Sequence, residues 1–239
     1  MALQHSPSIV TSGLVLCLDA ANPRSYSGSG STWYDVSGNG NHFTLYNRPS
    51  YSNGSLTFNG TTQYAASVSN INLTSYSSIT CEIWLTAASG STGIAIEHTA
   101  NWNTNTGGWG LAVNSNGGGL QANMMHTNHN SEGARNYAFT IGTNWNCQTN
   151  IFSTIVDSTG RLAYGNASLM TFDGTNGYPT NTATTAGGSF ANAILYLASR
   201  AGSTGFLNAS ISMIKIYGQK LTADQITQNF NATRGRYGI

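Results

Sequence analysis

Short runs of apolar residues recur along the whole chain, and each is bounded by glycine, asparagine or serine. Runs this short, with turn residues at both ends, are typical of β-strands. In the run Ile79–Ala87 the apolar side chains alternate with the others, so they fall on one face of a strand. Strands are predicted at Leu14–Leu18, Ser55–Asn59, Ile79–Ala87, Trp109–Val113, Leu120–Met124, Asn150–Val156, Ile194–Ala198 and Ser210–Tyr217. The pattern predicts an all-β fold of many short strands.

In the last predicted strand, Ser210–Tyr217, the apolar residues do not decide which side chains share a face. Ile211 and Ile216 belong to one face, and either Met213 or its neighbour Ile214 completes that face. The interpretation of this strand therefore carries two alternatives.

One helix is predicted near the end of the chain. Thr222-Ala223-Asp224-Gln225 is a capping box, with threonine at the N-cap and glutamine three residues later. Its apolar side consists of Leu221, Ile226 and Phe230. We expect the helix to end near Asn231 and to lie on the strands.

Charge is scarce in this sequence. Of 239 residues, 9 are Lys or Arg and 8 are Asp or Glu, so 7% of the chain is charged and the net charge is +1, whereas a typical domain is about 25% charged. Nine dispersed cations cannot neutralise a nucleic-acid backbone, and a helical bundle needs more Ala, Glu, Lys and Leu. Because 39% of the residues are hydrophobic, disorder is excluded as well. Neither a nucleic acid nor a membrane is an expected partner.

The chain is expected to fold as one domain in a reducing compartment. Its three cysteines, Cys17, Cys81 and Cys147, show no short spacing, and the first two lie in predicted strands. No apolar stretch reaches the roughly 18 residues of a membrane span. The first ten residues have neither a basic head nor an apolar run, so we expect synthesis in a host cytoplasm without a signal peptide.

The order of several motifs points to a known family. These are Gly13-Leu14-Val15-Leu16-Cys17-Leu18-Asp19-Ala20, Trp33-Tyr34-Asp35-Val36-Ser37-Gly38-Asn39-Gly40-Asn41, Leu56-Thr57-Phe58-Asn59-Gly60-Thr61-Thr62-Gln63-Tyr64, Ser78-Ile79-Thr80-Cys81-Glu82-Ile83-Trp84 and Lys215-Ile216-Tyr217-Gly218-Gln219-Lys220-Leu221-Thr222-Ala223-Asp224-Gln225-Ile226. Together they resemble the concanavalin A-like lectin/glucanase superfamily, specifically laminin-G-like domains frequent in phage structural proteins. The resemblance implies a jelly-roll sandwich of two antiparallel sheets, with adjacent first and last strands and one short C-terminal helix. We assign residues 1–12 to an N-terminal arm, 13–233 to the sandwich and 234–239 to a C-terminal tail.

The carboxylates do not match the glucanases of this superfamily. Those enzymes place two carboxylates across the scissile bond, on a strand motif of Glu, Asp two residues later, and a further Glu. Glu82, Glu97 and Glu132 each lack an Asp at that spacing. We therefore expect a protein without enzymatic activity.

Metal sites are weakly indicated, and no cofactor is expected apart from calcium, which many relatives carry. Gln63 stands where the family has an acidic residue, which leaves Asp35 as the calcium candidate. The competing role for Asp35 is to cap the turn Ser37-Gly38-Asn39. His126 and His129, three apart in a polar segment, are the transition-metal candidates, against plain surface positions.

Sugar binding has its own candidates. Trp102, Asn103 and Asn105 combine an aromatic face with amides, and Trp145 between Asn144 and Asn146 does the same. The alternative is that these asparagines only build turns. Trp84 and Trp109 are expected in the core.

The leading functional hypothesis is a non-enzymatic phage virion structural protein at the virion surface, either a capsid decoration or a fibre-type subunit. Its partners would be other virion subunits, and we expect a homo-oligomer, because a surface rich in small uncharged residues suits polar subunit packing. The alternative is a carbohydrate-binding adhesion module that recognises host surface polysaccharide.

Overall fold

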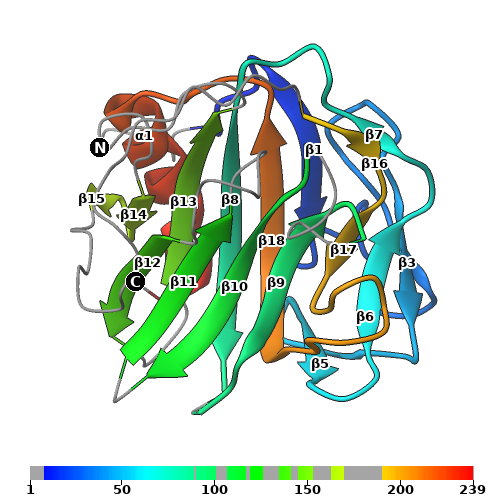
Figure 1. Cartoon of the computed structure of the whole chain (residues 1–239). Coiled ribbons are helices and arrows are strands. Elements are labelled where there is room, and N and C mark those ends of the chain that lie inside the picture. Colours follow the sequence, from blue (N-terminus) through cyan, green and yellow to red (C-terminus); the bar gives the residue numbers. More distant parts are fainter. Residues whose placement is uncertain are drawn as a thin grey trace, which may run out of the picture.

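The computed structural model describes residues 8–88, 90–100, 107–116, 119–125, 135–140, 145–152, 163–169 and 190–238. They form two antiparallel eight-stranded sheets and a small two-stranded one, with one α-helix at the C-terminal end (Figure 1). The predicted all-β sandwich of two antiparallel sheets with one short C-terminal helix is therefore confirmed. No helix among the described residues is both long and apolar enough to cross a membrane.

The first sheet has β18 near its centre. In order across the sheet its strands are β15 (Ser168–Leu169), β14 (Ala163–Gly165), β13 (Trp145–Phe152), β8 (Ser78–Ala87), β18 (Asn208–Tyr217), β5 (Ser55–Asn59) and β4 (Ser50–Ser52). β1 (Leu14–Asp19) pairs with the second half of β18, on the side where β5 pairs with its first half. The first and last strands are thus adjacent, as the resemblance implied.

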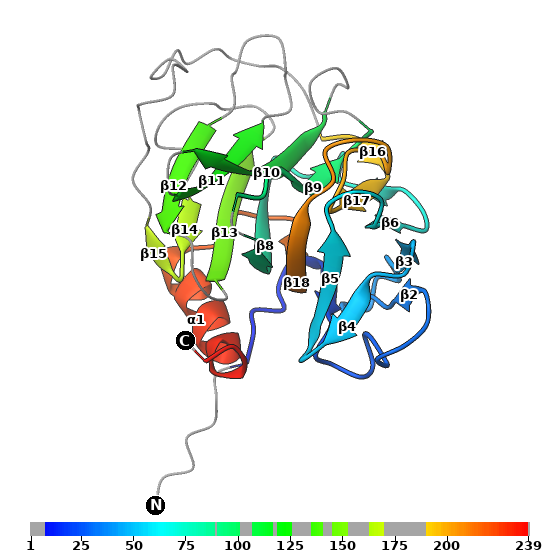
Figure 2. The ribbon, with the colours of Figure 1, turned by 90° about the horizontal axis from the view of Figure 1, so that it is seen from below.

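The second sheet packs against the first, and the two appear as layers when seen from below (Figure 2). Its strands, in order, are β12 (Arg135–Thr140), β11 (Gly119–Met125), β10 (Trp109–Asn116), β9 (Gly93–His98), β17 (Leu195–Leu197), β6 (Tyr64–Ser67), β3 (Phe43–Tyr46) and β2 (Thr32–Trp33). β7 (Ile71–Asn72) and β16 (Asn192–Ala193) form the small sheet.

The core lies between the two large sheets and follows the predicted alternation. Ile79, Cys81, Ile83 and Leu85 of β8 all point into it. In β18 the register shifts between Ile211 and Met213. This bulge moves the alternation by one residue, so the core takes Ile211, Ile214 and Ile216, while Met213 lies outside the core cluster. Cys17 and Cys81 are free and buried. Trp109 belongs to this core as expected, whereas Trp84 is buried on the outer face of the first sheet, against Phe230 and Tyr237.

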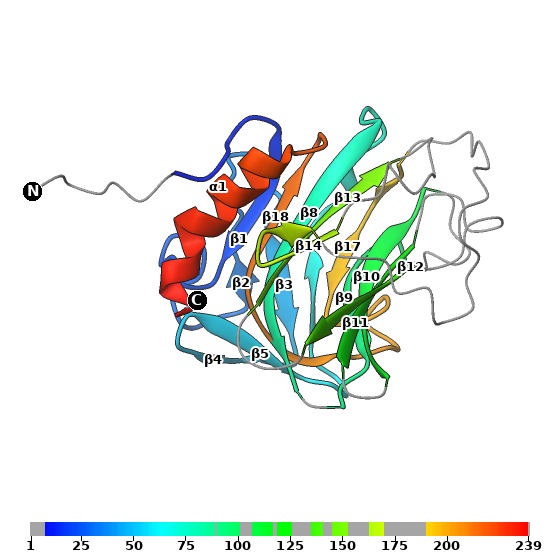
Figure 3. The same cartoon turned by 90° about the vertical axis from the view of Figure 1, so that its left-hand side faces the viewer.

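Helix α1 (Ala223–Thr233) lies on the outer face of the first sheet (Figure 3). The predicted capping box is present: Thr222 Oγ1 accepts from the Gln225 backbone, and the Thr222 backbone donates to Gln225 Oε1 at 2.9 Å. Ile226 is buried, and Phe230 stacks on Trp84 with ring centroids 5.8 Å apart. The helix continues two residues past the predicted end and leads into a 3₁₀ turn, η2 (Arg234–Arg236).

Both ends of the described chain pack on the same outer face. The backbone of Val10 donates to Asn229 Oδ1 at 2.8 Å and accepts from the Tyr217 hydroxyl at 3.0 Å. At the other end, Arg236 forms an ion pair with Asp19 at 2.6 Å. Residues 8–12 and 234–238 therefore cover the sheet together with α1.

Candidate functional site

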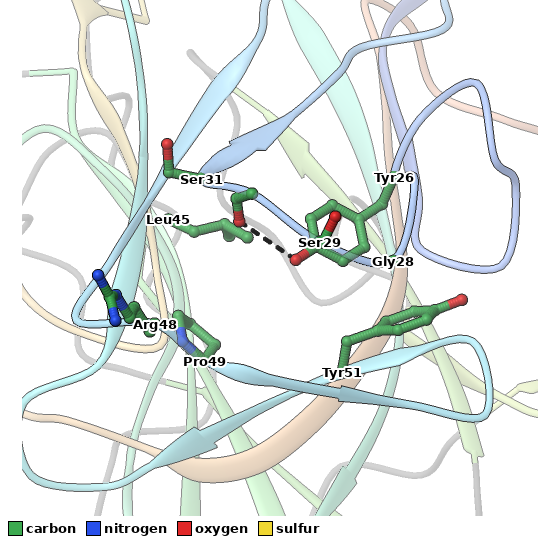
Figure 4. Close-up of a pocket in the computed structure, with 9 residues that line it drawn as sticks. Tyr26, Gly28, Ser29, Ser31, Leu45, Arg48, Pro49 and Tyr51 are labelled. Atoms are coloured by element: carbon green, nitrogen blue, oxygen red, sulfur yellow. Dashed lines mark hydrogen bonds between the residues drawn. The ribbon is translucent and has the colours of Figure 1, made fainter.

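A pocket of about 560 Å³ opens where an edge of the first sheet meets an edge of the second. We call it the edge pocket. It is lined by Tyr26, Gly28, Ser29, Gly30, Ser31, Leu45, Arg48, Pro49 and Tyr51. These residues come from the loop between β1 and β2, from β3 of the second sheet, and from β4 of the first sheet with the turn that leads into it (Figure 4). The site therefore depends on the packing of the two sheets.

Two tyrosines form the aromatic wall of the edge pocket. The rings of Tyr26 and Tyr51 meet edge to face, with centroids 5.1 Å apart and planes at 63°. Tyr26 is buried, and its hydroxyl donates to the Gly30 carbonyl at 3.2 Å. Burial raises the pKa of Tyr26 above its ordinary value, and nearby Tyr51 raises it further. Tyr51 is 37% exposed, so its ring remains accessible to a ligand.

The loop that carries Tyr26 is anchored by its neighbour Ser25. The Ser25 hydroxyl donates to the Tyr34 carbonyl at 2.6 Å and accepts from the Asp19 backbone at 3.0 Å. Gly28 and Gly30 both have φ near 92°, a conformation that favours glycine. This Gly-Ser segment brings backbone groups and serine hydroxyls to the rim of the pocket.

The turn at the far end of the pocket carries its one charged side chain, Arg48. Asn47 and Arg48 have φ of 59° and 55°, both in the left-handed region. Gln63 holds this turn, because its Nε2 donates to the carbonyls of Asn47 at 3.0 Å and Arg48 at 2.9 Å. The Asn47 amide in turn donates to the Thr62 carbonyl at 2.7 Å. Gln63 thus acts as a donor to main-chain oxygens.

Asp35, the calcium candidate, lies buried beside β1. Its Oδ1 accepts from the backbones of Cys17 and Ser37, both at 2.9 Å. Its Oδ2 accepts from the Ser37 hydroxyl at 2.8 Å and the Asn41 backbone at 2.9 Å. The carboxylate thereby organises the turn that follows it. Among the described residues, no group of three or more His, Cys, Asp or Glu side chains is placed to hold a metal ion.

Most of the other predicted site residues lie outside the described residues, namely Trp102, Asn103, Asn105, His126, His129 and Asn144. Trp145 and Asn146 begin β13, where their backbones pair with Leu85 and Trp84. The sugar site predicted on these residues stays a prediction.

The sequence reasoning missed the edge pocket. It looked for tryptophan flanked by asparagine, whereas the pocket uses Tyr26 and Tyr51 with a Gly-Ser loop and Arg48. The available signal was the segment 26–31, a tyrosine followed by alternating serine and glycine. Nothing in the sequence placed that segment against Arg48.

A second group of aromatic side chains lies on the outer face of the second sheet, and we call it the tyrosine face. Tyr46 and Tyr64 occupy paired positions on β3 and β6, and their rings stack at 4.4 Å with planes at 4°. Tyr196 of β17 pairs with Glu97 of β9. Burial raises the pKa of Tyr64, and the nearby Tyr46 and Tyr196 raise it further. Burial also raises the pKa of Tyr196, and Tyr46 and Glu97 raise it further.

Glu97 is buried beside this face and accepts from Arg200 Nε at 3.2 and 3.4 Å. Glu82 lies on the outer face of the other sheet, where it pairs with Lys215 at 2.9 Å. The two carboxylates are therefore on opposite sides of the sandwich and do not form a pair.

Comparison with known proteins gives the fold and no family. No protein-family model matches the chain, and no curated protein matches it. A Trypanosoma rangeli sialidase in complex with sialic acid aligns with 98% of this chain and 36% of its own, at a TM-score of 0.65 and 14% identity. The botulinum neurotoxin serotype D binding domain aligns with 94% of this chain and 53% of its own, at a TM-score of 0.61 and 9% identity. This chain thus spans about a third of the sialidase and half of the toxin chain.

The expectation that the protein is not an enzyme is wrong as an inference from fold and composition. Several structures with this fold are sialidases, including one at a TM-score of 0.62 and 14% identity. Our expectation rested on missing pairs of carboxylates, but sialidases are glycoside hydrolases that use a tyrosine nucleophile. At this identity the likeness shows the fold alone and assigns no catalytic residue.

Proposed function

We propose that this chain is a carbohydrate-binding module and that the edge pocket is its glycan-binding site. One observation carries the proposal: a pocket of about 560 Å³ combines tyrosine rings with serine hydroxyls and loop backbone groups. Sugars offer apolar ring faces, which stack on aromatic rings, and hydroxyls, which bond polar groups. The volume lies within the 300–1,000 Å³ range of ordinary small-molecule sites, roughly enough for one or two sugar rings.

The fold and its neighbours support the same class of ligand. The order of sequence motifs and the adjacency of β1 and β18 both support membership of the concanavalin A-like, laminin-G-like domains. One of the similar structures is a sialidase bound to sialic acid, which favours a sugar as the ligand. A lectin-like module with an aromatic pocket is the simplest function consistent with these observations.

A glycan array with the full chain tests this function, and Tyr51→Ala is the informative variant. Removing the half-exposed wall ring should weaken binding about tenfold, since an aromatic contact contributes about 0.5–1.5 kcal/mol beyond area burial. Tyr34→Ala is the matched control, because Tyr34 is 48% exposed and does not line the pocket. An array without any bound glycan, or equal losses in the two variants, would rule the proposal out.

The place of the module on a phage virion stays a prediction from the sequence resemblance. In that role the chain decorates a capsid or forms part of a fibre, contacts other virion subunits and presents its pocket to host surface polysaccharide. Electron microscopy of particles should then reveal its density at the virion surface. If the protein is absent from the particles, the virion role is wrong, whereas the proposal of glycan binding is unaffected.

A further inference from the structure

We propose that the edge pocket selects an acidic sugar, one that carries a carboxylate, and that Arg48 binds this carboxylate. The inference rests on the proposed glycan-binding function and names the chemical class of its ligand.

The pocket has a single formal charge, and that charge is positive. Of its nine lining residues Arg48 is the only charged one, and none is acidic. The ion pairs found among described residues engage Arg200, Lys215 and Arg236. Arg48 makes no ion pair with any residue in the part of the chain that the structure describes. Its guanidinium therefore remains available to an anion from outside.

The main chain at Arg48 adopts a conformation that does not suit arginine. With φ of 55°, it lies in the left-handed region, which glycine and asparagine tolerate far better than other residues. A glycine would fit here without this strain. The Arg48 side chain makes no hydrogen bond or ion pair with any described residue that would offset this strain. Eight described non-glycine residues have positive φ, and Arg48 is the one among them that lines the edge pocket, where such strain is typical of functional sites.

The strained turn is held in place by its surroundings. Gln63 binds the carbonyls of Asn47 and Arg48 from one side, and Pro49, which is buried, follows directly. Because these contacts engage only the main chain, they fix the turn and leave the guanidinium free. The main chain of Arg48 is thus fixed beside the pocket before a ligand arrives, while its exposed side chain remains free to turn toward one.

The other lining residues complete a site for a charged sugar ring. In Figure 4, Tyr26 and Tyr51 lie on one side of the opening and Arg48 lies on the other, with Leu45 and Pro49 between them. A sugar ring stacked on Tyr51 can direct a ring substituent toward Arg48. A planar guanidinium matches a carboxylate through two parallel hydrogen bonds. A nucleic-acid phosphate backbone needs several cations, and the pocket has one.

Titration of the full chain with matched oligosaccharides tests this inference. The probes are sialyllactose, trigalacturonic acid, lactose 3′-sulfate and lactose, whose affinities calorimetry can compare. We expect at least one carboxylated probe to bind tenfold or more tightly than lactose, and more tightly than the sulfated probe. Arg48→Gln should abolish that preference, and Arg48→Lys should retain only part of it.

Two variants separate binding from folding. Arg48→Gly removes the side chain and relieves the left-handed strain, so it should resist urea at least as well as the original chain while losing the preference. Arg24→Gln is the control, because Arg24 is an exposed arginine that does not line the pocket, and it should change nothing.

The outcomes that overturn the inference are distinct from failure of the proposed function. Equal affinity for lactose and the carboxylated probes, or a preference that survives in Arg48→Gln, overturns the acidic-sugar inference and leaves glycan binding intact. Equal or tighter binding of the sulfated probe overturns the choice of carboxylate. No binding of any probe, together with a blank glycan array, rejects both the inference and the proposed function.

Discussion

The two outer faces of the sandwich treat buried charge in different ways. On the first sheet, Glu82 and Lys215 are both fully buried and 2.9 Å apart, beneath α1 and the two ends of the chain. The second Glu82 oxygen accepts from Asn229 of α1 at 3.0 Å. On the second sheet, no described helix covers the corresponding pair, in which Glu97 is buried but Arg200 is 23% exposed.

The two ion pairs differ in how much water reaches them, and this determines which other contacts each pair requires. An ion pair cut off from water must be completed by other hydrogen bonds, and α1 brings Asn229 for that purpose. An ion pair with one partner in water needs fewer hydrogen bonds from the protein, because water solvates the exposed partner. The tyrosine face can therefore remain uncovered. The first face is therefore built for stability, and the second stays accessible.

The comparison is tested most strongly by Lys215→Met. This variant keeps the volume of the side chain but leaves the Glu82 carboxylate buried without its cation, which costs about 3–5 kcal/mol of unfolding free energy. Urea unfolding measures the loss. The double variant Glu82→Gln with Lys215→Met should recover a large part of it, since no buried charge remains. A loss below about 1 kcal/mol in the single variant would contradict a sealed ion pair.

A pH titration examines the core side of the second sheet. Burial is the main cause that lowers the pKa of His98 to about 4 from its ordinary 6.5, and its Nε2 lies 3.0 Å from the Ile71 carbonyl. As the pH falls below 6.5, the unfolded chain gains a proton on this residue that the folded chain does not. Stability that is complete above this range therefore declines between pH 6.5 and 4, by up to about 3 kcal/mol.

Unfolding curves at several pH values for the original chain and for His98→Gln measure this effect. The variant should lose that part of the pH dependence, whatever its stability at neutral pH. An unchanged slope between pH 6.5 and 4 would show that His98 is not the group responsible.

Arg200→Met is the counterpart of Lys215→Met on the uncovered face. Because water already reaches Arg200, it can partly solvate the Glu97 carboxylate, and we expect a loss of about 1–2 kcal/mol. Salt should weaken this pair more than the sealed one. If Arg200→Met costs as much as Lys215→Met, the covering helix does not explain the difference between the faces.

Arg236→Met should have the smallest effect. Although Arg236 lies 2.6 Å from Asp19, its side chain is 48% exposed. A surface ion pair contributes about 0–1 kcal/mol. The expected result is a loss at or below the upper end of that range in the same urea assay. A larger loss would mean that water does not screen this ion pair despite the exposure of Arg236.

Local patterns made much of the fold predictable. The alternation in β8 and the capping box of α1 each depend on residues within one element, and both are present as expected. The bulge in β18 decided between Met213 and Ile214, and no local pattern could do so, because a bulge arises where one strand meets its neighbour.

The candidate site was less predictable, since it depends on contacts between distant segments. The Glu82–Lys215 pair joins residues 133 positions apart. The edge pocket joins β3 of one sheet to β4 of the other. The left-handed turn at Arg48 contains no glycine, so the sequence does not indicate it. Sequence chemistry alone therefore directed attention to tryptophans rather than to this arginine and its tyrosines.

The position of β18 has a consequence for how the chain folds. This strand follows every other described strand in the sequence, yet it lies between β8 on one side and β1 and β5 on the other. Until it is synthesised, the first sheet is divided into three parts, β15-β14-β13-β8, β5-β4 and β1 alone, with unpaired edges and exposed apolar side chains. Contacts between such distant segments also make folding slow. The first sheet can therefore be completed only after Tyr217 has left the ribosome, and until then its open edges can pair with other chains.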